Sequence, residues 1–85
     1  MSPPETEGLR NIGPTTAAWL AEVGIDSPDE LRRRGAVDAY RTVKAWRPWD
    51  VTLTLLWALE GAITDRDWMD VPPERRLELR RALEE

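Results

Sequence analysis

Apolar side chains recur along most of the chain at the spacing of a helix face. After Pro14, for example, Ala17, Leu20 and Ala21 stand three and four residues apart and share one side of a helix. Residues 51–55 alternate as a strand would, but they run directly into a continuous apolar segment of helical length. The pattern therefore predicts an all-α protein.

The clearest helix start is the segment SPDE at residues 27–30. Ser27 suits the N-cap, the proline after it suits the first helical position, and Glu30 completes a capping box. Arg32–Arg34 follow where cations complement the helix dipole, and Gly35 favours termination. We expect a helix between these signals.

Residues 51–63 carry apolar side chains on almost every side, which is typical of a central helix that other helices surround. Asp50 is the expected N-cap of this helix. The other helices are expected at about residues 5–10, 14–23, 28–34 and 36–46, and a last one starts at Pro72 and Pro73. We therefore predict five or six short helices in one domain over residues 8–85, after a flexible N-terminus at residues 1–7.

Composition narrows the chemistry. A chain of 85 residues has room for one core. It contains no Cys and no His, which excludes disulfides, thiolate or imidazole metal sites and catalysis by either residue. We expect no enzyme activity, no cofactor and no metal site. The longest apolar run is too short to span a bilayer and the N-terminus does not resemble a signal peptide, so we expect a cytoplasmic protein without a membrane partner.

The net charge of −4 is unevenly distributed. Residues 1–31 hold six acids and one base, residues 32–49 six bases and one acid, residues 50–74 six acids and one base, and residues 75–85 four bases and three acids. The segments therefore carry −5, +5, −5 and +1. The overall charge argues against nucleic-acid binding, but the second segment keeps a local basic surface open.

The segment LRNIGPTTA at residues 9–17 resembles a helix-hairpin-helix, a unit that presses a tight turn against a DNA phosphate. Together with later motifs it is similar to the C-terminal domain of the TfoX/Sxy competence regulators, over about residues 8–83. These motifs are Val23-Gly24-Ile25-Asp26-Ser27, Leu31, Gly35-Ala36-Val37, Ala39-Tyr40, Ala58-Leu59-Glu60-Gly61-Ala62-Ile63 and Trp68. The resemblance implies a helical domain with a helix-hairpin-helix-like unit.

The resemblance also implies a role. Members of this family act with the cyclic-AMP receptor protein to switch on competence genes for natural transformation. They usually carry a separate N-terminal domain, which we expect this chain to lack. The function that the resemblance implies is therefore regulation of competence or transcription.

The hairpin turn contains Asn11 and Gly13, two residue types that can adopt the positive φ of a tight turn. It leaves two interpretations open. Asn11, Gly13, Thr15 and Thr16 are the candidate phosphate contacts, since backbone amides at the start of a helix attract anions. Pro14 removes one of those amides, and two threonines stand where a cation would help. We favour the alternative, in which the side chain of residue 12, an isoleucine, fills the core and the turn keeps its shape without binding DNA.

A second candidate DNA contact is the basic patch Arg32, Arg33 and Arg34. The competing interpretation is that these arginines only complement the C-terminal end of their helix. Direct, non-specific DNA binding through the hairpin turn and this patch is the alternative function. We favour the helix-end interpretation.

The candidate protein interface is the turn that contains Trp46, Arg47 and Trp49. Exposed tryptophans would anchor a protein partner or a homodimer, whereas tryptophans folded over the helix ends would only fill space. Trp19, Trp57 and Trp68 are expected mostly in the core. The function we predict is non-enzymatic protein–protein contact with an unknown partner.

Glu60 lies within the apolar central helix, where a carboxylate needs a partner. We expect a structural bond to an arginine or to a helix N-terminus rather than a catalytic role, because no second catalytic group accompanies it. Gly61 beside it predicts a close approach to another element.

Overall fold

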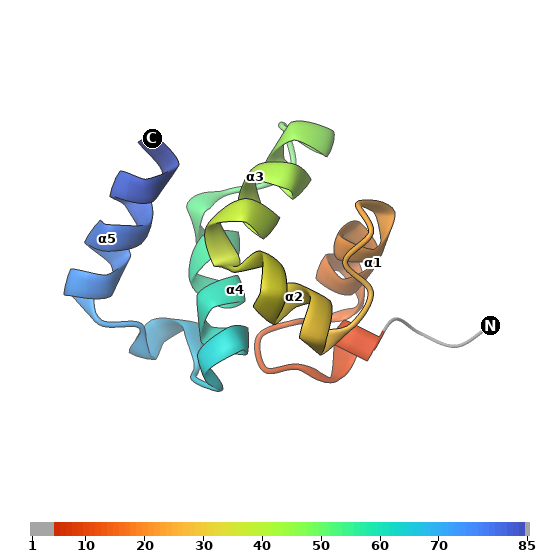
Figure 1. Ribbon diagram of the computed structural model, residues 1–85, viewed down its shortest axis with the longest axis horizontal. Helices are drawn as coiled ribbons and strands as arrows, with labels where there is room; N and C mark the ends of the chain where they lie inside the picture. Colours follow the sequence, from red (N-terminus) through yellow and green to blue (C-terminus); the bar gives the residue numbers. More distant parts are fainter. Residues whose placement is uncertain (1–4, 85) are drawn as a thin grey trace.

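The computed structural model describes residues 5–84, which form five α-helices and two short 3-10 helices (Figure 1). In chain order these are η1 (Glu5–Gly8), α1 (Pro14–Glu22), α2 (Pro28–Arg34), α3 (Ala36–Trp46), α4 (Leu53–Thr64), η2 (Trp68–Asp70) and α5 (Pro73–Glu84). No strand occurs within these described residues. The predicted all-α fold is confirmed. None of the described helices is long and apolar enough to cross a membrane.

Helix α4 lies at the centre of the molecule. In Figure 1, α1 and α5 lie on opposite sides of it. Helix α3 contacts all four other α-helices, and α4 also contacts α2 and η2. The arrangement agrees with the apolar residues on nearly every side of the 51–63 segment, since a helix covered all round must be apolar all round.

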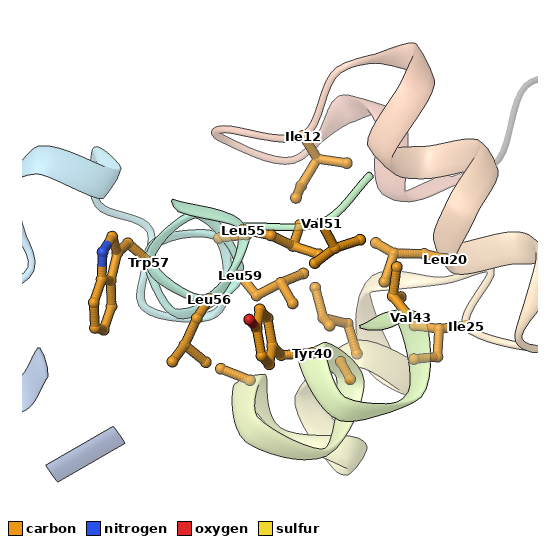
Figure 2. Packing of buried hydrophobic residues seen from close by; sticks show 14 of the residues in the cluster. Ile12, Leu20, Ile25, Tyr40, Val43, Val51, Leu55, Leu56, Trp57 and Leu59 are labelled. Atoms are coloured by element: carbon orange, nitrogen blue, oxygen red, sulfur yellow. The ribbon is translucent and has the colours of Figure 1, made fainter. Parts of the chain in front are cut away.

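The core forms between α4 and the helices around it. Leu56 and Leu59 of α4 are fully buried with Leu20 of α1 and Val43 of α3. Figure 2 shows these side chains gathered on one side of α4, with Trp57 on the other. Trp57 is also buried, and the guanidinium of Arg76 lies 5.2 Å from the centroid of its ring. The central helix thus has two apolar faces: a large one in the core, and a smaller one at Trp57 that Arg76 covers.

The start of the central helix differs from the prediction. Helix α4 begins at Leu53 with Thr52 as its N-cap, two residues later than expected. The ammonium of Lys44 donates to the carbonyl of Val51 at 2.7 Å, and the Val51 side chain is buried as a non-helical residue. Because this contact keeps Val51 outside the helix, Asp50 is not the N-cap of α4. Its carboxylate lies 3.5 Å from the guanidinium of Arg47 instead.

The helix signals near the N-terminus had mixed outcomes. The Ser27 cap is confirmed, because its hydroxyl accepts a hydrogen bond from the Glu30 amide at 3.1 Å. The expected helix over residues 5–10 is shorter, a 3-10 helix that ends at Gly8. Residues 1–4 of the expected flexible segment lie outside the described residues, whereas Thr6 is fully buried.

Candidate functional site

The hairpin turn between η1 and α1 is shaped by Asn11. Its φ of 69° is in the left-handed region, as predicted, and Asn tolerates this conformation better than most residues. Gly13 has a φ of −88° and serves as the N-cap of α1, so the positive φ considered for this glycine is not adopted. Ile12 points into the core and is buried, as expected (Figure 2).

The side-chain amide of Asn11 is bonded at both ends to backbone groups far along the chain. Its nitrogen donates to the carbonyls of Arg66, at 2.8 Å, and Ala58, at 3.4 Å. Its oxygen accepts from the amide of Trp68 at 3.1 Å. We call this contact the Asn11 lock. Because both polar ends are occupied within the protein, this side chain is not free to bind phosphate.

Gly61 makes the Asn11 lock sterically possible. A Cβ atom at Gly61 would lie 2.5 Å from the Asn11 side-chain nitrogen and 2.6 Å from the Arg66 carbonyl oxygen. Both separations are shorter than van der Waals contact. The predicted close approach is present, and the partner at Gly61 is the hairpin turn and the loop after α4.

The other candidate phosphate contacts lie at the start of α1. Gly13 and Thr15 are exposed, and Thr16 is half-buried. Pro14 occupies the first turn, so an amide is missing where an anion would need one. The nearby Arg10 guanidinium donates to the Asp65 carbonyl at 3.3 Å, which turns it toward the loop after α4.

Each arginine of the predicted basic patch is paired with an acid. Arg32 lies 3.2 Å from Asp29, Arg33 pairs with Glu30, and Arg34 pairs with Asp38 of α3. Three acids therefore match three bases. The structure brings these arginines together at the end of α2, but with their formal charge balanced, which favours the helix-end interpretation.

Trp46 and Trp49 are exposed at the turn between α3 and α4, by 62% and 96% of their surface. Folding over the helix ends, the alternative considered from the sequence, is therefore wrong for this pair. We call residues 46–49 the Trp corner. Large exposed aromatic side chains of this kind are more often found at interfaces than on the rest of a protein surface.

Glu22 of α1 holds the Trp corner in place. Its carboxylate accepts from the Trp46 indole nitrogen at 2.7 Å and from the Arg47 guanidinium at 2.7 and 3.0 Å. The hydrogen bond from Arg47 lowers the pKa of Glu22 most, burial opposes the change, and the Trp46 bond and the charge of Arg47 add to the lowering. Arg47 also lies 5.7 Å from the centroid of the Trp19 ring.

Glu60 has the structural partner that the sequence predicts. Its buried carboxylate accepts from the guanidinium of Arg75 on α5 at 2.6 Å. The pKa of Arg75 is raised, first by this hydrogen bond, against a smaller opposing effect of burial. Of the three tryptophans expected in the core, Trp57 is buried, whereas Trp19 and Trp68 are half-buried.

Sequence reasoning missed two features of this region. Arg76 of α5 donates to the carbonyls of Trp68, at 3.0 Å, and Val71, at 3.1 Å, and so ties η2 and the residue after it to α5. The second feature is a groove of about 270 Å³ between α1 and the start of α4, with Trp19 and Trp68 among its walls. Trp19 and Trp68 are 49 residues apart in the chain, and nothing in the sequence between them predicts that they line the same groove.

Comparisons with known proteins agree with this architecture. A crystal structure of an uncharacterized protein from Listeria monocytogenes has a TM-score of 0.85 to this chain at 28% identity. The match covers 93% of this chain and 89% of that one. No curated protein sequence matches significantly. Residues 3–83 match the sequence model of the TfoX C-terminal domain, which is nearly the whole chain.

Proposed function

Because the chain belongs to the TfoX C-terminal domain family, we propose that it is a non-enzymatic interaction domain that acts in competence or transcription regulation through protein–protein contacts. The observation that carries the proposal is the Trp corner. Trp49 is almost fully exposed although its side chain is large and mostly apolar. A partner that covered it would remove that surface from water.

The size of this contribution is large for one residue. A tryptophan buries about 150–250 Å². At about 25 cal/mol per Å² this corresponds to about 4–6 kcal/mol before the cost of association. Trp and Arg are also the residue types that dominate binding energy in interfaces. The Trp corner provides both in one turn.

Pre-organisation strengthens the case. Two hydrogen bonds from Arg47 and one from Trp46 fix these side chains on Glu22 before any partner arrives. Side chains that are already ordered lose less conformational freedom on binding. Trp46 and Arg47 are therefore held in place beside Trp49, which itself projects into solvent.

The contacts at the two candidate DNA surfaces support a protein partner over DNA. Arg32–Arg34 are each matched by an acid, and the Asn11 amide is bonded to the loop after α4. A DNA site needs cations available for phosphates, because counterion release supplies most of the affinity. Direct DNA binding is the competing hypothesis, so the test must also be able to detect it.

The test compares three variants of the purified domain with the wild type. Proteins that copurify from the native cell are identified, produced separately and titrated by calorimetry against the wild type. We expect Trp49→Ala to weaken a true partner more than tenfold, while Leu77→Ala, an exposed apolar control on α5, leaves it unchanged. A labelled duplex is titrated in parallel at low and moderate salt. Salt-sensitive duplex binding that is lost when Arg32–Arg34 become alanine would overturn the proposal.

A further inference from the structure

The groove between α1 and α4 is a second recessed surface beside the Trp corner. Asn11 and Trp68 meet at one end of it, where they share a hydrogen bond. Trp19 and Asp50 lie at the other end, since both contact Arg47. The groove follows the first turns of α4 between these ends. A tryptophan therefore stands at each end.

The groove is lined by apolar and polar side chains in equal measure. Val51, Leu55 and Ala58 form its buried apolar part, and Asn11, Thr16, Thr52 and Thr54 add polar groups that are exposed or half-buried. Its volume of about 270 Å³ lies just below the range of about 300–1,000 Å³ that is typical of pockets for whole small molecules. The space suits one large or two small side chains of another protein.

The one charged side chain among the described residues that line the groove is Asp50, at the Trp19 end. Arg47 pairs with both Asp50 and Glu22, and the ammonium of Lys44 donates to the carbonyls of Pro48 and Val51 on either side of Asp50. These four charges sum to zero, and only the carboxylate of Asp50 lines the groove. Aromatic faces also attract cations, as the position of Arg47 over Trp19 illustrates. An apolar side chain flanked by a cation is therefore complementary to this end.

We propose that the groove receives an aliphatic or aromatic side chain of a protein partner and that a neighbouring Lys or Arg of that partner pairs with Asp50. The inference rests on the proposed function and extends it. Trp49 precedes Asp50 in the chain, so one partner segment spans the Trp corner and the groove. The partner surface is thus apolar and basic.

The experiment uses three small probes with one aromatic body and different charges: 2-phenylethylammonium, 2-phenylethanol and 3-phenylpropionate. They are titrated into the domain with ¹⁵N-labelled tryptophan, whose five indole N–H signals report separate places. Trp19 and Trp68 report the groove, Trp46 and Trp49 the Trp corner, and Trp57 the far face of α4.

We expect saturable shifts at Trp19 and Trp68 and none at Trp57. The ammonium probe should bind at least threefold more tightly than the carboxylate probe. Asp50→Asn should abolish that preference, whereas Asp26→Asn, a change at an exposed acid outside the groove, should keep it. Both substitutions are at exposed positions, so each variant is expected to fold.

Several results would overturn the inference. These are the absence of a saturable shift at Trp19 and Trp68, equal affinity for the cation and the anion, or shifts confined to the Trp corner. Shifts of Trp19 and Trp68 on dilution without a probe would show that a second copy covers the groove, which also overturns it. Trp49→Ala lies outside the groove lining, so the titration of that variant succeeds or fails independently of the partner test above.

Discussion

The hairpin turn and the Trp corner use their side chains in opposite ways. At the turn, the side chain of Asn11 bonds backbone groups 47 to 57 residues away. At the corner, Trp49 projects into solvent, and Trp46 touches the rest of the protein through a hydrogen bond to Glu22.

The difference shows that a turn can keep the shape of a known motif while its polar groups make hydrogen bonds within the protein. The turn resembles a DNA-binding unit, yet its amide holds the loop after α4. The corner contains Trp49, which has the largest exposed fraction of the exposed large hydrophobic side chains among the described residues. Four substitutions test this contrast between a structural turn and a free corner.

The largest effect is expected from Asn11→Ala. It removes three hydrogen bonds and leaves a residue with a poor left-handed conformation at φ 69°. We expect a loss of about 3 kcal/mol in unfolding free energy. Urea unfolding followed by tryptophan fluorescence measures it. Asn11→Gly, which keeps the backbone conformation, should lose about 1 kcal/mol less. A loss under about 1 kcal/mol for the alanine variant would show that the lock is not structural.

Gly61→Ala should have the next largest effect. The new Cβ would meet Asn11 and the Arg66 carbonyl at 2.5 and 2.6 Å. Overpacking should outweigh the better helix propensity of alanine, for a net loss of about 2 kcal/mol. The same urea series measures it. Combined with Asn11→Gly, the loss should be smaller than the sum of the two, since one of the two clashes disappears. Strict additivity would contradict the contact.

A smaller, pH-dependent effect is expected from Glu22→Gln at the Trp corner. Since the pKa of Glu22 is lowered in the folded protein, its ionised form adds stability above its ordinary value near 4.5. This contribution is lost as the pH falls through the lowered folded value. The wild type should exceed the variant in urea midpoint at pH 7, and the gap should close toward pH 3. A gap that stays constant over this range would exclude the carboxylate as its source.

The smallest effect on stability is expected from Trp49→Ala. With 96% of its surface exposed, removing the ring should change the unfolding free energy by no more than about 0.5 kcal/mol. Thermal and urea unfolding of the isolated domain check this. A loss above about 1 kcal/mol would mean that the ring packs against the protein in solution, and the corner would no longer be free for a partner.

The parts of the fold predicted from sequence are those with local causes. The Ser27 cap depends on residues three apart, and the central helix on the apolar pattern of its own segment. The all-helical class follows from such signals. The start of α4 was predicted too early because Lys44 bonds the Val51 carbonyl, and no local pattern contains that contact.

The candidate sites were predicted less well because they depend on which distant residues meet. The positive φ of Asn11 followed from its residue type, but its partners in the loop after α4 did not. The pairing of Arg34 with Asp38 required the turn between α2 and α3. Whether Trp49 is covered or exposed depends on where α3 ends and α4 begins and on how the two helices pack. The residues next to Trp49 in the sequence do not determine this.

The Asn11 lock also sets an order of events during folding. The turn precedes all three partners of its Asn11 side chain along the chain: the Ala58 carbonyl follows 47 residues later, the Arg66 carbonyl 55 and the Trp68 amide 57. Contacts over such separations carry a larger loop-closure cost than local ones and form late in folding. The packing of α3 on α4, which are neighbours in the chain, can therefore form before the loop after α4 docks on the hairpin turn.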